Sequence, residues 1–121
     1  MANYTVAHIE IPTTDPNASG TFYNEVFGWK IETNLEHNYV TYQTEGLRGG
    51  FAGPAEPTYK PDRLLVYLAT DDIDATLATI EAHGGKRVHP KTVIPHVGAW
   101  AVFADPAGNH IGLFTSARTA S

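Results

Sequence analysis

Hydrophobic and polar residues alternate strictly at the start of this chain. Along residues 5–12, Ile9 and Ile11 point to one side of an extended segment, while His8 and Glu10 point to the other. A period of two is typical of a β-strand that is buried on one face. This segment is therefore predicted to be a strand, with an imidazole and a carboxylate on its polar side.

After this strand, the spacing of the apolar residues lengthens to that of a helix. Asp15 is followed by Pro16, and a capping carboxylate before a proline at the first helical position is a helix start signal. Gly28 supplies the stop signal. Between them, apolar side chains recur at helical spacing, at Ala18, Phe22, Val26 and Phe27.

Three short strands complete the first half of the chain. The pattern predicts strands over 29–33, 39–43 and 48–52, with a polar turn at 34–38 between the first two. No helix follows the pair Gly49-Gly50, so it lacks the context of a phosphate-binding loop. We interpret it as a close backbone approach or a bulge.

The second half repeats this order after a linker at 54–62 that holds three prolines. It predicts a strand over 64–69, then a helix that begins at Asp71 or Asp72 and ends at Gly84-Gly85. Further strands are expected over 86–92, 100–104 and 110–115, the last two being joined by the turn DPAGN.

The two halves align without gaps. Residues 9–31 match residues 66–88 at an offset of 57, which places Asp15 on Asp72 and Gly28 on Gly85. Such a repeat indicates an internal duplication. We predict an α+β fold in one domain over 1–121, built from two tandem βαβββ modules at about 5–53 and 63–115. Each helix covers one face of a mostly antiparallel sheet, so the helices lie outside and the sheet encloses a cup.

Composition narrows the function classes. Of the 121 residues, 42% are hydrophobic and 17% charged, as in a globular protein, and the net charge of −5 gives no basic face for nucleic acid. There is no cysteine, no apolar run of membrane-spanning length and no signal-peptide pattern. We expect a cytoplasmic protein that binds neither membrane nor nucleic acid.

Four segments carry a resemblance to a known family. These are His8 in the first strand, FYNEVFGWKI (22–31), DDIDAT (71–76) and AVFADPAGNHIGLF (101–114). They resemble the vicinal oxygen chelate superfamily, which comprises the glyoxalase, bleomycin-resistance and extradiol-dioxygenase proteins. The similarity is greatest to small members related to lactoylglutathione lyase. It covers nearly the whole chain and implies a homodimer.

The resemblance implies a divalent metal held by up to four inward-facing His or Glu side chains. His8 matches the first position, but the duplication places its counterpart on Leu65, and the usual glutamate falls on Gly112. The fourth position lies within 48–52, which contains no acid or imidazole. One ligand cannot hold a catalytic metal, so we expect no metal and no other cofactor. An alternative set remains open, in which His8, Glu10 and His110 form a two-histidine, one-carboxylate site.

Strand parity predicts which side chains line the cup. We expect a partly aromatic wall with few polar groups, as small-molecule sites usually have. The inward-facing residues are expected to be His8, Glu10, Tyr39, Thr41, Gln43, Leu65, Tyr67, Trp100, Val102, His110 and Phe114.

Glu10 is the most informative of these residues, because a carboxylate in an apolar cup needs a partner or a proton. Arg63 and His8 are the candidate partners. The sequence leaves three functions open. The first is metal-independent binding of a small hydrophobic or aromatic molecule. The second is a metal-dependent lyase, isomerase or dioxygenase. The third is a metal-free acid–base enzyme that uses Glu10 and His8, with Tyr39 or Tyr67 as the acid.

Overall fold

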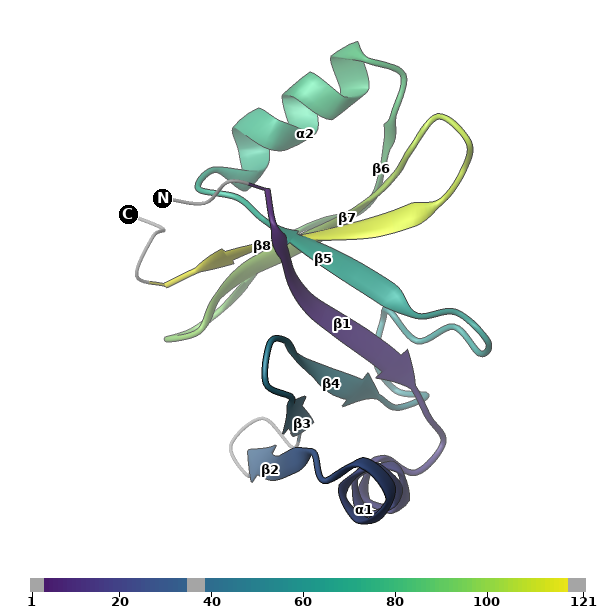
Figure 1. Cartoon of the computed structure of the whole chain (residues 1–121). Helices are drawn as coiled ribbons and strands as arrows, with labels where there is room; N and C mark the ends of the chain where they lie inside the picture. Colours follow the sequence, from purple (N-terminus) through teal and green to yellow (C-terminus); the bar gives the residue numbers. More distant parts are fainter. Residues whose placement is uncertain (1–3, 35–38, 118–121) are drawn as a thin grey trace. The chain divides into compact units, whose positions relative to one another are not determined.

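The described residues form eight strands and two helices, so the α+β class and the mostly antiparallel pairing are confirmed (Figure 1). The computed structural model describes residues 4–34 and 39–117. It divides into two compact units, which are described in turn. The first unit is His8–Leu65. The second unit is the chain from Val66 onward together with Val6 and Ala7.

In the first unit, one helix packs on a sheet of strand order β2-β3-β4-β1. β1 is parallel to β4, and the other neighbours are antiparallel. The residue range predicted for each strand of this unit agrees with the structure to within one residue. The elements are β1 (Val6–Pro12), α1 (Pro16–Phe27), β2 (Lys30–Asn34), β3 (Tyr39–Gln43) and β4 (Arg48–Ala52).

The second unit repeats this topology in the order β6-β7-β8-β5, with β5 parallel to β8. As predicted, its helix is capped by Asp72 and ends before Gly84-Gly85: the last helical residue is Ala82, and the chain then turns through Gly84, whose φ of +95° lies in the left-handed region. The elements are β5 (Leu65–Ala69), α2 (Ile73–Ala82), β6 (Lys86–Ile94), β7 (Gly98–Ala104) and β8 (His110–Ser116).

The capping interactions are also duplicated. The carboxylate of Asp15 accepts a hydrogen bond from the Ala18 backbone at 3.1 Å, and Asp72 accepts one from Ala75 at 3.0 Å. Each cap is typically worth about 1 kcal/mol of helix stability. The offset of 57 relates both pairs, and it also relates two hydroxyl–hydroxyl bonds, Thr13 to Ser19 at 2.7 Å and Thr70 to Thr76 at 2.8 Å.

Each unit has its own core between the helix and one face of the sheet. In the first unit, the buried side chains of Val40, Tyr42 and Phe51 pack with Tyr23 of α1, and the Trp29 ring stacks on Tyr42 at 4.6 Å. In the second unit the core residues are Ile73, Leu77, Ala99, Ala101, Phe103 and Leu113. Because side chains alternate along a strand, the residues between these core positions lie on the opposite face.

The apolar stripe of α1 differs from the expectation. Phe22, Val26 and Phe27 are all more than half exposed, at 53%, 56% and 59%. The helix instead faces the sheet through Gly20 and Tyr23. A β-carbon at Gly20 would come within 3.0 Å of the Ile31 side chain, so the missing side chain lets the helix approach β2 closely.

Candidate functional site

Two rows of side chains cross the sheet of the first unit on the face away from α1, which we call the polar face. Strand register aligns Arg48 with Gln43, and Gln43 with Lys30, in one row. The second row lies two residues further along the strands. In it, strand register aligns one residue from each of four strands: Glu10, Gly50, Thr41 and Glu32. His8 lies on β1 two residues before Glu10 and so shares this face.

A hydrogen-bond network joins β1 to β3 and to the loop at 53–62. The Tyr39 hydroxyl donates to Glu10 Oε2 at 2.9 Å, and the Thr58 hydroxyl donates to Glu10 Oε1 at 2.8 Å. His8 Nε2 lies 3.2 Å from the Tyr39 hydroxyl and 4.0 Å from Glu10 Oε2. Both carboxylate oxygens of Glu10 are therefore bonded to hydroxyl groups of this network.

The direction of these bonds defines the tautomer of His8. Tyr39 has a single hydroxyl proton, which it gives to Glu10, so its oxygen can only accept from His8. The proton of the neutral imidazole then sits on Nε2. The network runs as a chain of donors from His8 through Tyr39 to Glu10.

The electrostatics agree with a neutral imidazole. Burial lowers the pKa of His8 from 6.5 to about 4, and the positive charge of Arg48 contributes to the same shift. A second carboxyl group lies close by, since the pKa of Glu56 is raised by burial and by the negative charge of Glu10. At neutral pH, His8 can therefore donate or accept a hydrogen bond but carries no charge.

The glycine pair of β4 makes room for two tyrosines. A β-carbon on Gly50 would collide with the Tyr39 ring and hydroxyl, and one on Gly49 would collide with the Tyr42 hydroxyl and the Ile9 carbonyl. This confirms the close approach expected at Gly49-Gly50. The Tyr42 hydroxyl donates to the Ile9 carbonyl at 2.8 Å, and burial raises its pKa to about 12, so it stays protonated.

A hollow of about 220 Å³ opens on the polar face. It holds three of the predicted lining residues, His8, Thr41 and Gln43, together with charged groups that the sequence analysis did not single out. The complete lining is His8, Lys30, Glu32, Thr41, Tyr42, Gln43, Arg48 and Gly49.

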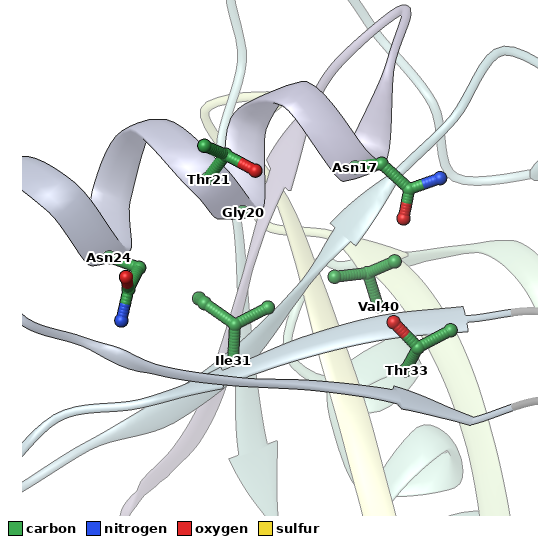
Figure 2. A pocket seen from close by; sticks show the side chains of 7 residues that line it. All are labelled: Asn17, Gly20, Thr21, Asn24, Ile31, Thr33 and Val40. Carbon is green, nitrogen blue, oxygen red and sulfur yellow. The ribbon is translucent and has the colours of Figure 1, made fainter.

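A second hollow, of about 410 Å³, lies between α1 and strands β2 and β3 (Figure 2). It is lined by Asn17, Gly20, Thr21, Asn24, Ile31, Thr33 and Val40. None of these side chains ionises, and the Asn24 amide already donates to the Trp29 carbonyl at 3.0 Å. This hollow has no group for acid–base chemistry, whereas the polar face does.

The predicted residues of the second unit also share one face of their sheet. Tyr67 pairs with Gly112, and Val102 pairs with Gly112 from the other side. Trp100 and Phe114 are direct cross-strand neighbours. His110 is paired with Ala104, and Leu65, the residue of β5 that groups with the first unit, is buried.

His89 adds an aromatic contact that was not predicted. Its ring stacks on Trp100 with centroids 4.3 Å apart and an angle of 20°. The sequence offered no signal for this pairing, because β6 and β7 have irregular register between Arg87 and Thr92.

The residues of each unit do not fit the metal site that the resemblance implies. Within the described part of the chain, neither unit holds three or more His, Asp or Glu side chains that could bind one ion. Gly112, at the usual glutamate position, faces the Tyr67 ring, which fills the space of a β-carbon. The set His8, Glu10 and His110 draws on both units and stays a prediction.

One partner of Glu10 was missed. The Thr58 hydroxyl donates to Glu10 Oε1 at 2.8 Å, while His8, one of the two candidate partners, lies 4.0 Å from Oε2. Thr58 lies in the predicted linker at 54–62, and a lone threonine there carries no sequence signal that would mark it as a partner.

Comparison with known proteins identifies relatives of several kinds. The glyoxylase-like protein CFP32 of Mycobacterium tuberculosis is 28% identical over 117 residues, which cover 91% of this chain and 45% of that protein. The anthracycline biosynthesis protein DnrV of Streptomyces peucetius is 30% identical, covering 84% of this chain and 43% of that protein. The chain thus spans less than half the length of these two curated relatives.

Among solved structures, the methylmalonyl-CoA epimerase of Streptomyces coelicolor, bound to 2-nitronate-propionyl-CoA, superposes with a TM-score of 0.69. It is 20% identical and covers 97% of both chains, so the likeness concerns the fold. Neither helix of the described chain has the length and apolarity needed to cross a membrane. A family model matches residues 5–113, and the chain belongs to the Glyoxalase/Bleomycin resistance protein/Dioxygenase superfamily.

Proposed function

We propose that this chain is a metal-independent protein that binds a small organic molecule on the polar face of its first unit. The observation that carries the proposal is the bonding of Glu10, whose two oxygens accept from the hydroxyls of Tyr39 and Thr58. The imidazole of His8 is neutral at physiological pH and is itself bonded to Tyr39. Such an arrangement offers a ligand hydrogen bonds and flat contact area.

The size of the hollow and the family support this reading. At about 220 Å³, the hollow lies just below the usual range of ligand sites, which favours a ligand with a short hydrophobic or aromatic body. The names of the relatives refer to small organic molecules, an anthracycline in one case and a coenzyme A thioester in the other. We extend only the general property, small-molecule binding, to this chain.

The test is a ligand screen by thermal shift on protein purified without added metal, run with and without a chelator. A ligand that favours the folded state raises the melting temperature by mass action. We expect hits whose shifts are unchanged by the chelator, and a metal content well below one ion per chain by elemental analysis. A stoichiometric divalent ion whose removal abolishes the shifts would overturn the proposal.

A second candidate function is proton abstraction by Glu10, and the Tyr39–Glu10 hydrogen bond favours it. Glu10 as a base would take a proton from a C–H next to a carbonyl group and leave an enolate. Once protonated, Glu10 no longer needs the Tyr39 hydroxyl, which is then free to donate to the enolate oxygen. His8, bonded to Tyr39 at 3.2 Å, would hold that hydroxyl in place.

Exchange of ligand C–H protons with deuterated solvent, followed by NMR, separates these two functions. For any hit with an acidic C–H, the second function predicts exchange that Glu10→Gln removes while binding persists. Glu56→Gln is the matched control, because Glu56 lies near Glu10 yet makes no hydrogen bond to Tyr39 or Thr58 among the described residues. Exchange that is absent in the wild type, or equal in Glu10→Gln, would rule the second function out.

We also propose that the protein is a homodimer. The family resemblance and sheet edges that can pair support this assembly, and analytical ultracentrifugation would measure the oligomeric state directly. A cytoplasmic location fits the absence of cysteine from the sequence.

A further inference from the structure

Three polar side chains from three adjacent strands converge on the 220 Å³ hollow. Arg48 of β4, Gln43 of β3 and Lys30 of β2 are aligned by strand register, are exposed, and all line the hollow. We refer to them as the cationic row. They bring a guanidinium fork, an amide and an ammonium to the same rim.

No described residue forms an ion pair with the charges of this row. Among the described residues, neither Arg48 nor Lys30 forms an ion pair within 4.0 Å, whereas Arg87 and Lys91 elsewhere on the chain do. Glu32 is the one carboxylate among the described residues that line the hollow. The rim therefore carries two fixed positive charges against one negative charge, with His8 neutral.

We propose that the ligand of the polar face carries an oxyanion, a carboxylate or a phosphate, which Arg48 and Lys30 bind with help from the Gln43 amide. This inference rests on the proposed function, because it assigns the chemistry of one end of the same ligand. Arginine binds carboxylate and phosphate oxygens in a bidentate manner, and such charge-assisted bonds are the stronger ones in proteins. Arg48 and His8 both line the hollow, and the positive charge of Arg48 adds to burial in lowering the pKa of His8.

The strand geometry also sets a distance between the two ends of the ligand. The row containing Glu10 and Glu32 lies two residues along the strands from the cationic row. Two residues of a strand span roughly 7 Å. A ligand anchored by its anion at Arg48 therefore places the opposite end beside Glu10, where a hydrogen-bond donor or an acidic C–H is tolerated and a second anion is not.

The test uses three probes of one shape: benzoate, phenyl phosphate and the neutral benzamide. Binding is measured by two-dimensional amide NMR titration of the full chain at low and at physiological ionic strength. We expect benzoate or phenyl phosphate to shift the amides of Lys30, Gln43 and Arg48, more weakly at the higher salt because of screening, and we expect benzamide to leave them unchanged. The comparison of the two anions tells a carboxylate site from a phosphate site.

Arg48→Gln should weaken binding of the preferred anion at least about tenfold, because a hydrogen-bonded charge is lost. Lys30→Gln should weaken it by a smaller factor. The matched controls are Arg63→Gln and Lys60→Gln, which remove like charges from the same unit outside the lining of the hollow. Both should bind as the wild type does. Melting curves of all four variants verify that they are folded.

The proposal is overturned if benzamide binds as well as the anions, if none of the three probes binds, or if Arg63→Gln loses as much affinity as Arg48→Gln. If the thermal-shift screen yields a neutral ligand, these outcomes overturn the oxyanion inference but not the proposed function. A screen in which no ligand binds independently of the chelator would overturn both the proposed function and the oxyanion inference.

Discussion

The hydroxyl of Tyr39 lies over the backbone of Gly50, in the space that a β-carbon would occupy. The tyrosine starts on β3, crosses β4 at this glycine, and reaches Glu10 on β1 with its hydroxyl 2.9 Å from the carboxylate. A residue with a side chain at position 50 would block this path. The hydrogen-bond network of the polar face therefore depends on a residue that takes no part in it.

Replacing Gly50 by alanine should break the network. The new methyl group would overlap the Tyr39 ring, and overpacking of this kind typically costs about 1–3 kcal/mol of unfolding free energy. Urea denaturation measures the cost. Gly46→Ala is the control, because a β-carbon there meets nothing within 4 Å and should leave stability nearly unchanged. Equal effects of the two substitutions would contradict the steric argument.

Removing the hydroxyl alone tests the network without a steric clash. Tyr39→Phe leaves Glu10 without one of its donors and His8 without its acceptor, which should lower the unfolding free energy by about 1–2 kcal/mol. Tyr59→Phe is the matched control, because the hydrogen bond of Tyr59 among the described residues is made by its backbone amide to the Glu56 carbonyl, which the substitution keeps. If Tyr39→Phe proves as stable as this control, the network contributes nothing to the fold.

The depressed pKa of His8 predicts a pH dependence of stability. The unfolded chain protonates this imidazole near pH 6.5, but the folded chain does so only near pH 4. Between these values the unfolded state binds more protons, so stability falls as the pH is lowered from 6.5 to 4, by up to about 3 kcal/mol from this group. Above pH 6.5 the group contributes no further change.

The measurement is the difference in unfolding free energy between wild type and His8→Gln, taken at pH 7.5 and at pH 4.5. Carboxylates titrate in both proteins and cancel in the difference. Wild type should lose stability relative to the variant on acidification, while His83→Gln, at the exposed end of α2, should follow the wild type. A difference that is independent of pH would mean that His8 titrates normally.

Gly112 allows a direct test of the metal argument. Glutamate at this position would restore the side chain that metal-binding relatives carry, but its β-carbon would enter the Tyr67 ring. Gly112→Glu should therefore lower the melting temperature and should not create a site for Zn²⁺ detectable by calorimetry. Gly46→Glu, which meets open space, is the control for the added charge. A stable Gly112→Glu protein that binds Zn²⁺ stoichiometrically would show that the remaining ligands are in place.

Much of the fold could be predicted from periodicity. Alternation of His8 and Glu10 with Ile9 and Ile11 defines the two faces of β1, and the structure packs Ile11 against the core of the first unit. The repeat at an offset of 57 transferred the cap at Asp15 to Asp72, which the hydrogen bonds confirm. Strand alternation and helix caps depend on residues that are close in the sequence, so they can be predicted from the sequence alone.

The contacts of the polar face could be predicted only in part. Parity puts Tyr39 on the same face as Glu10, but it does not say that the side chain crosses a neighbouring strand at Gly50, since strand register is not local. The bond from Thr58 to Glu10 depends on the path of a loop, which periodicity does not predict. The buried face of α1 was predicted incorrectly for a similar reason. The helix comes closest to β2 at Gly20 and not at Phe22, because the missing side chain leaves room for Ile31.

The first strand, β1, is divided between the two units. Val6 and Ala7 group with the second unit, whose Ala69 amide donates to the Thr5 carbonyl at 2.9 Å, whereas the rest of the strand groups with the first unit. A fragment expressed from residue 63 onward would lack that carbonyl partner, although it contains a full copy of the repeated motif. Cutting the polypeptide between its two repeats would therefore separate hydrogen-bond partners that the whole chain keeps together.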